Sequence, residues 1–165
     1  VIEPGGPAYE RLIKRFGADI LGSDGTIDRA KLAGIVFEEE GDLDALNRIV
    51  HPVVLKEVVE GITSLRLMER PPRIVVLEVP LLAEAPVFAD VADTVVALLA
   101  PAGVRLQRAV SAGMDPLDAS RRIARQATDE ERAALADCTI DNSGTLEELM
   151  TKLEEYWLEV APNDA

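Results

Sequence analysis

The arginines in the second half of the chain are the first residues that could do chemistry. Five of them lie between Arg105 and Arg125, where there are only two acidic residues, and Arg132 follows. A guanidinium group binds phosphate through a planar, bidentate fork of N–H donors. Because the whole chain has a net charge of −13, this local positive excess indicates a phosphate site, although ion pairs on a solvated helix surface explain it equally well. If two short helices form a hairpin here, Arg121, Arg125 and Arg132 converge.

Two glutamates mark the end of an apolar stretch from Ile74 to Leu81. Six of its eight residues are β-branched or leucine, which is typical of a strand buried on both faces of a parallel sheet. A carboxylate inside such a stretch is costly unless it is paired or solvated at a ligand site. Glu78 and Glu84 therefore indicate the carboxyl end of the strand, where open α/β sheets bind ligands. The alternative is a glutamate at a strand edge that faces water.

Two further segments carry polar groups in positions that suit a site. Asn142, Ser143 and Gly144 follow a predicted strand and precede a capped helix, where backbone amides and an amide side chain can contact a base; the alternative is a simple turn. His51 precedes Pro52, which breaks or kinks a helix. We therefore expect the His51 ring at a bend, either exposed to a cleft or in a structural role. With one histidine and one cysteine in the chain, a zinc site is not expected.

Hydrophobic spacing predicts the elements that position these groups. Apolar runs predict strands at 74–82, 94–99 and 138–140. In the first half, helices are expected at 9–16 before Gly17, after a cap at Asp28, and from Asp42 with an interruption at Pro52. In the second half, a helix is expected after Pro101, and three more are expected after caps at Asp115, Thr128 and Thr145. Strands alternate with helices in the second half, which predicts a parallel sheet with right-handed crossovers. The first seventy residues are expected to be a helical insertion, residues 38–41 a solvated connection, and the tail from Pro162 frayed.

Length and charge restrict the class of protein. The chain has 165 residues, enough for one domain with a core. Its negative charge argues against a nucleic-acid or anionic-membrane binder. Cys138 is the only cysteine and cannot form an internal disulfide, so a cytoplasmic location is expected. We find neither a run of apolar residues long enough to span a bilayer nor a signal-peptide pattern.

Six segments of the sequence, in order, resemble the bacterial dephospho-CoA kinases. They are EPGGPAYERLIKRFG, DGTIDRAKLAGIVF, LNRIVHPVV, VVLEVPLLAE, RIARQAT and ADCTIDNSGTLEEL. Members of this family are P-loop kinases that phosphorylate the ribose 3′-hydroxyl of dephospho-CoA with MgATP, the last step of coenzyme A biosynthesis. The resemblance implies one kinase-like α/β domain over residues 1–165, with a parallel sheet covered by helices. It places a helical substrate-binding part at 1–70, the core at 71–100 and 137–161, and a lid region at 101–136.

The resemblance also implies roles for single residues. On the acceptor side, His51 matches the histidine of the family's histidine-proline pair. Glu78, Pro80 and Leu81 match the family's strand that passes near dephospho-CoA. The family usually has Asp where this chain has Glu78, and Phe where it has Ala83. On the nucleotide side, Arg132 matches a lid arginine that faces the ATP phosphates, which makes it the catalytic candidate. The lid helix matches Arg122 and Gln126, and the turn that contacts adenine matches Asn142 and Gly144. The implied partners are small molecules, with self-association possible.

One part of the family pattern does not occur in this sequence. The family begins with a strand, a glycine-rich phosphate loop, a helix, and a second strand that ends in an Asp-containing motif. No G-x-x-x-x-G-K-[ST] occurs here. In P-loop kinases the first strand lies between those that match 74–82 and 94–99, and without it both would face unpaired backbone groups, at about 1–3 kcal/mol each. We therefore expect a truncated version of a longer protein or, if it is complete, one that is rearranged, paired with another chain or inactive.

Two alternatives to the kinase hypothesis stay open. One is a non-catalytic module that binds a CoA-like ligand or a partner, since this sequence contains no phosphate loop. The other is a P-loop kinase of the nucleoside monophosphate type, which the long helical segment containing His51 and Pro52 disfavours.

Overall fold

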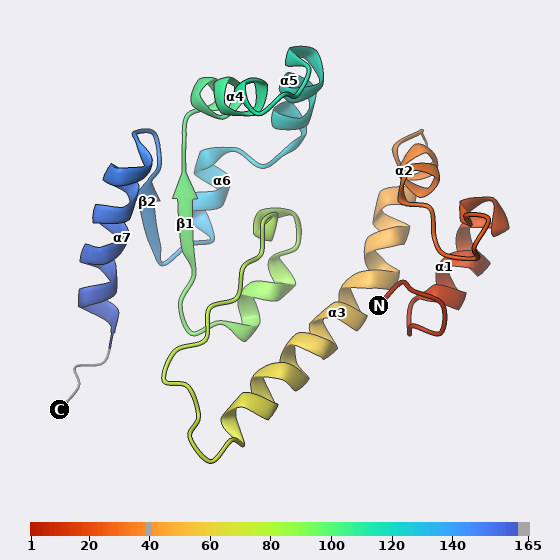
Figure 1. Cartoon of the computed structure of the whole chain (residues 1–165), viewed down its shortest axis with the longest axis horizontal. Helices are drawn as coiled ribbons and strands as arrows, with labels where there is room; N and C mark the ends of the chain where they lie inside the picture. The colour runs from red at the N-terminus through yellow and green to blue at the C-terminus, as the bar shows by residue number, and fades with distance from the viewer. Residues whose placement is uncertain (39–40, 162–165) are drawn as a thin grey trace. The chain divides into compact units, whose positions relative to one another are not determined.

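The computed structural model describes residues 1–38 and 41–161, and the chain divides into two compact units, Val1–Pro71 and Pro72–Ala165 (Figure 1). Glu39, Glu40 and the tail from Pro162, for which a solvated connection and fraying are expected, lie outside the described residues. Among the described helices, none has the length and apolar character needed to cross a membrane.

Three α-helices form the N-terminal unit: α1 (Tyr9–Phe16), α2 (Arg29–Glu38) and α3 (Asp42–Arg66). Gly17 ends α1 as predicted, because its positive φ of 84° favours glycine and its N–H donates to the Ile13 carbonyl at 2.8 Å. Asp28 caps α2 as predicted, and its carboxylate accepts hydrogen bonds from the amides of Ala30 and Lys31. The core of this unit consists of Ala8, Leu12, Ile20, Ile27, Leu32 and Val36.

Helix α3 runs without interruption through Pro52, so the predicted break at His51 is wrong. Proline removes one backbone hydrogen bond from a helix. On both sides of Pro52, however, residues pack against the core of the unit, including Ile49, Val50 and Val53. Helices in proteins are stabilised mostly by such packing, and here it maintains the helix across the proline. His51 is therefore a partly buried residue within a helix.

The C-terminal unit contains a parallel sheet, as the order of the elements predicts. Its strands are β1 (Val96–Leu99) and β2 (Cys138–Asp141), and Val96 lies opposite Cys138. The second and third predicted strands are thus confirmed, with small changes of bounds. The helices are α4 (Ala102–Ser111), α5 (Pro116–Arg125), α6 (Asp129–Ala134) and α7 (Leu146–Val160).

The first predicted strand is wrong. Residues 74–79 have no regular secondary structure, and they lead into the short 3₁₀ helices η2 (Leu82–Glu84) and η3 (Pro86–Val91). Val76 is 82 % exposed. A strand needs a hydrogen-bonded neighbour, and in the described part of the chain the sheet has two strands, with β2 on one edge of β1. Among the described residues, no strand pairs with residues 74–79 or with the other edge of β1.

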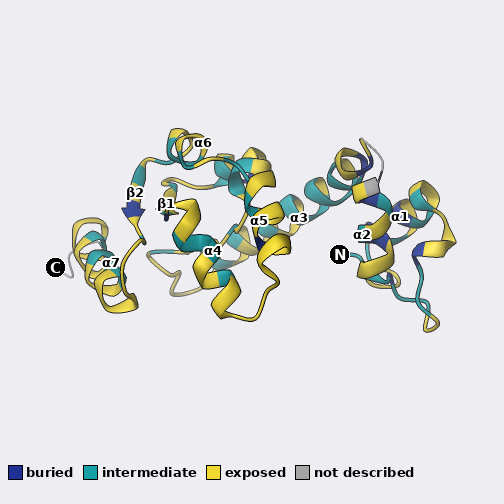
Figure 2. Cartoon of the chain, turned by 90° about the horizontal axis from the view of Figure 1, so that it is seen from above, coloured by how far each residue is buried: buried dark blue, intermediate teal, exposed yellow. Residues whose placement is uncertain are grey.

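Local capping signals were predicted correctly in this unit. The Asp115 carboxylate accepts from the amides of Leu117 and Asp118 at the start of α5. Capping boxes open α6 at Thr128 and α7 at Thr145. Buried residues cluster in the N-terminal unit and are more scattered in the C-terminal unit (Figure 2).

Candidate functional site

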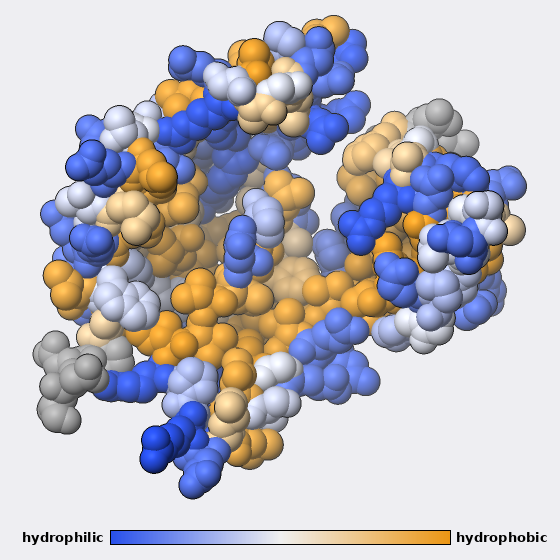
Figure 3. Space-filling view, viewed as in Figure 1, coloured by the Kyte–Doolittle hydropathy of each residue, from blue (hydrophilic) through white to orange (hydrophobic). Residues whose placement is uncertain are grey.

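An open pocket of about 590 Å³ lies within the C-terminal unit. One wall comes from residues 76–80 and the other from residues 94–98, so the pocket lies beside β1 on the edge away from β2. Most of its lining is apolar, and hydrophobic side chains reach the molecular surface in this unit (Figure 3). The charged and amide side chains of the lining are Glu78, Glu84, Arg105, Gln126 and Arg132.

Two arginines of this lining share one carboxylate. Asp129 Oδ1 lies 3.1 Å from Nη1 of Arg132 and 3.5 Å from Nη2 of Arg105. Gln126 Oε1 accepts from the same two guanidinium groups, at 3.4 and 3.5 Å. The arginine side chains are only 20 % and 22 % exposed. In this cluster two guanidinium groups face one carboxylate, while Glu78 and Glu84 lie elsewhere in the same lining. The N–H forks of the two arginines suit phosphate oxygens.

The surrounding elements hold this arginine pair in place. The Nε of Arg105 donates to the Ala100 carbonyl at 3.0 Å, which fixes the side chain against the end of β1. Arg132 lies on α6, whose first turn is fixed by the capping box at Thr128. Glu84 Oε1 accepts from the Ala127 amide at 2.9 Å and so joins η2 to the segment that enters α6. Arg105 is therefore held at the end of β1, and the segment that leads into α6 is held at η2.

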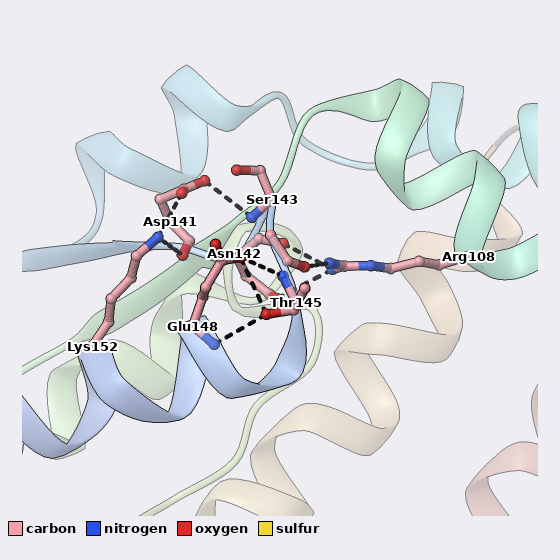
Figure 4. Close-up of polar contacts among 8 residues, drawn as sticks. Arg108, Asp141, Asn142, Ser143, Thr145, Glu148 and Lys152 are labelled. Atoms are coloured by element: carbon pink, nitrogen blue, oxygen red, sulfur yellow. Dashed lines mark hydrogen bonds and ion pairs between the residues drawn. The ribbon is translucent and has the colours of Figure 1, made fainter.

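A second polar group occupies the turn after β2 (Figure 4). Arg108 Nη1 donates to the Asn142 carbonyl at 2.8 Å and to Asn142 Oδ1 at 3.1 Å, and Nη2 donates to the Gly144 carbonyl at 2.6 Å. Asp141 accepts from the Ser143 amide at 3.0 Å and from Lys152 Nζ at 2.7 Å. Hydrogen bonding by Lys152, and next by Ser143, lowers the pKa of Asp141 to about 2.

Gly144 has no room for a side chain in this turn. A Cβ there would collide with the carboxylate of Glu148, which accepts hydrogen bonds from the backbone N–H and the hydroxyl of Thr145. The bond from the Thr145 amide also lowers the pKa of Glu148. The absence of a side chain at Gly144 therefore leaves room for the Glu148 carboxylate to reach Thr145.

The structure brings together only some of the predicted site residues. Arg132, Gln126, Glu78 and Pro80 line the pocket of the C-terminal unit. Asn142 and Gly144 lie together in the turn after β2. Leu81 is 47 % exposed, and neither it nor the exposed Arg122 belongs to the pocket lining.

His51 lies in the other unit. It lines a separate pocket of about 500 Å³, together with Asn47 and Arg29.

Sequence reasoning counted Arg105 and Arg108 in the arginine-rich stretch but gave neither a role of its own, and it did not consider Asp129. We expected Arg121 to accompany Arg132, but Arg121 pairs with Asp118 at 3.9 Å and is 64 % exposed. Arg105 and Arg108 lie three residues apart on α4, but this spacing does not reveal that Arg105 contacts Asp129 and Arg108 contacts Asn142.

Within the described residues, no group of three His, Cys, Asp or Glu side chains is arranged to hold a metal ion.

Strand β2 ends in the polar residues 141–143 at the carboxyl edge of the parallel sheet, which is where α/β proteins bind ligands. The arginine pair lies near that edge, so the fold and the site are those of an α/β protein whose donors suit a phosphorylated ligand. The chain belongs to the dephospho-CoA kinase family, whose model matches residues 1–148. It is thus a member of a phosphotransferase family, and the resemblance found in the sequence is confirmed.

Comparisons with known proteins agree with this assignment. The dephospho-CoA kinase of Leifsonia xyli subsp. xyli is 40 % identical over 158 residues, which cover 95 % of this chain and 79 % of that protein. That of Thermobifida fusca is 40 % identical over 161 residues, which cover 97 % and 78 %. Among solved structures, TT1252 from Thermus thermophilus matches with a TM-score of 0.72 and 29 % identity over 93 % of this chain and 76 % of that one. Dephospho-CoA kinase from Campylobacter jejuni shares the fold, with a TM-score of 0.65 and 20 % identity over 97 % and 79 %.

Proposed function

We propose that the protein transfers a phosphoryl group from MgATP to the ribose 3′-hydroxyl of dephospho-CoA. The observation that carries this proposal is the pair of arginines, Arg105 and Arg132, that share Asp129 in the pocket of a chain from the dephospho-CoA kinase family. A phosphate group offers several anionic oxygens to the two guanidinium forks, whereas Asp129 offers them one oxygen in this structure. Phosphate therefore competes with Asp129 for the same donors.

Each predicted site residue has a role in this proposal. Transfer is in line, and positioning and charge stabilisation supply most of the rate. Arg132 neutralises the charge on the transferred phosphoryl group, and Arg105 holds an adjacent phosphate oxygen. The remaining assignments are lid contacts for Arg122 and Gln126, adenine contacts for Asn142 and Gly144, and acceptor contacts for His51, Glu78, Pro80 and Leu81. In this proposal residues 1–70 bind the acceptor and residues 101–136 form the lid.

The test is a direct assay of CoA formation. The protein is expressed from the start codon of its gene, supplied with ATP, magnesium and dephospho-CoA, and the product is measured by chromatography. Arg132→Ala should lower kcat by about 100-fold or more, because it removes a group that stabilises the transition state. Arg132→Lys keeps the charge without the fork and should be intermediate. Arg70→Gln, at an exposed position beyond α3, is the control. If the wild-type protein forms no CoA, the proposal is wrong.

A second candidate is a non-catalytic module that binds a CoA-like ligand. The pocket of about 500 Å³ in the N-terminal unit favours it, because Asn47 and His51 lie there among mostly apolar residues. Calorimetric titration with dephospho-CoA and, separately, with ATP discriminates between the candidates. Binding of dephospho-CoA alone supports the module, and binding of both ligands supports the kinase.

A further inference from the structure

Arg108 is the residue that joins α4 to the turn after β2. Its three hydrogen bonds reach both Asn142 and Gly144, 34 and 36 residues away in the sequence. Two of them end on backbone carbonyls, at 2.8 and 2.6 Å. Charge-assisted hydrogen bonds of this kind are about twice as strong as neutral ones. The backbone of the turn is therefore fixed by a side chain from the helix that follows the neighbouring strand.

Other contacts hold the two ends of the turn, and two backbone N–H groups inside it are also bonded, that of Asn142 to the Leu99 carbonyl and that of Ser143 to Asp141. Lys152 donates to Asp141, at the end of β2. Glu148 accepts from Thr145, at the start of α7. Asn142 and Gly144 lie between these anchors, and Arg108 bonds to both of them (Figure 4).

Arg108 also determines how Asn142 can be used. A guanidinium group only donates hydrogen bonds, so the Asn142 atom facing Arg108 is the acceptor Oδ1. The backbone N–H of Asn142 donates to the Leu99 carbonyl at 2.7 Å, and its carbonyl accepts from Arg108. In the described part of the chain, this leaves the side-chain NH₂ of Asn142 to donate to a ligand.

We propose that Arg108 is a positioning residue for nucleotide binding, which holds the turn at Asn142 and Gly144 and orients the Asn142 amide so that its NH₂ donates to the base. Arg108 acts through its hydrogen bonds to these two residues. The proposal rests on the proposed function, since that function places the base at this turn. It also identifies the kind of base atom that Asn142 contacts: a hydrogen-bond acceptor, either a ring nitrogen or a carbonyl oxygen.

The test measures the affinities for ATP and dephospho-CoA separately, by calorimetry, on the protein expressed from the start codon of its gene. Arg108→Gln should weaken ATP binding by about tenfold, which corresponds to the net contribution of a hydrogen bond. Its affinity for dephospho-CoA should stay within about twofold of wild type, and a merely structural loss would weaken both. Arg108→Lys keeps a charged donor and should recover part of the ATP affinity. If Arg108→Gln does not fold, the affinities for ATP and dephospho-CoA are compared in Arg108→Lys instead. Arg70→Gln is the matched control.

Asn142→Asp separates positioning from recognition. Aspartate still accepts from Arg108, so the turn and the thermal midpoint should be retained, but it lacks the NH₂ donor, and ATP should bind about tenfold more weakly. Unchanged ATP affinity in Asn142→Asp would overturn the donor role.

If Arg108→Gln binds ATP as wild type does, or loses both ligands equally, the positioning role is wrong. A wild-type protein that binds no ATP would refute the proposed function itself and, with it, the role of Arg108. These results are distinguishable because the wild type is measured first.

Discussion

Asp129→Asn tests whether the shared carboxylate stabilises the C-terminal unit. Exposed ion pairs contribute about 0.2–1 kcal/mol, whereas hydrogen bonds to charged groups contribute about 1.5–3 kcal/mol. The Asp129 side chain is 32 % exposed and its arginine partners less so, so each pair should contribute about 1 kcal/mol. Asparagine keeps one acceptor oxygen, so we expect a total loss of about 1–2 kcal/mol. For a chain of this length that lowers the thermal midpoint by about 2–8 °C.

Asp118→Asn is the matched control for this measurement. Asp118 also pairs with an arginine three residues later and also lies in the first turn of its helix, but its side chain is 61 % exposed. Its replacement should cost less than about 1 kcal/mol. Thermal unfolding is followed by circular dichroism at pH 7, at low salt and in 0.5 M NaCl. At the higher salt concentration the screening length is on the order of 4 Å, so interactions between exposed charges are weakened. Equal shifts for the two variants would refute the view that partial burial of Asp129 makes its pairs stronger.

Three further predictions concern the turn after β2. Because the folded-state pKa of Asp141 is about 2, below its ordinary value of 3.8, its carboxylate favours folding above pH 3.8, and this stabilisation is lost as the pH falls toward 2. The difference in thermal midpoint between wild type and Asp141→Asn should therefore be present at pH 6 and vanish near pH 2; a constant difference would contradict this. Thr145→Ala should cost about 1 kcal/mol through loss of the α7 cap, whereas Thr145→Ser should restore most of it in urea denaturation. Gly144→Ala should cost a similar amount, about 1 kcal/mol, because its Cβ displaces the Glu148 carboxylate from Thr145; an unchanged urea midpoint would show that Glu148 relaxes freely.

Features that depend on neighbouring residues in the sequence were predicted well. The stop at Gly17, the cap at Asp28 and the capping boxes at Thr128 and Thr145 all occur as expected. Each of them is a contact within four residues, so the local sequence contains both partners. The parallel pairing of β1 with β2 also followed, because the order of strands and helices restricts the topology.

Features that depend on distant partners were predicted poorly. The apolar run at 74–79 has the composition of a buried strand but no hydrogen-bonded neighbour in the sheet. At Pro52 the reverse occurs, because packing around the proline maintains a helix that local propensity would interrupt. Composition thus indicated how these segments could fold, while their surroundings decided how they do fold.

The candidate site shows the same division. Arg132 and Gln126 were predicted from the resemblance, and both line the pocket. Asp129 was missed because its importance depends on the approach of Arg105 from α4, which the sequence does not reveal. The role of Arg108 was missed for the same reason, since its partners lie at least 34 residues away. Long-range ion pairs and hydrogen bonds become visible only when the elements are placed in space.

The edge of β1 that faces away from β2 has a consequence for how the protein behaves at high concentration. Val96 and Leu98 are partly exposed on this strand, and Val75 and Val76 are exposed on the segment that shares the pocket with it. Unpaired backbone groups beside apolar side chains can act as a template for strand addition, the process by which edge-to-edge aggregates form. We expect the isolated chain to associate through this edge. Val96→Lys should weaken this association, because it places a charge on the edge strand.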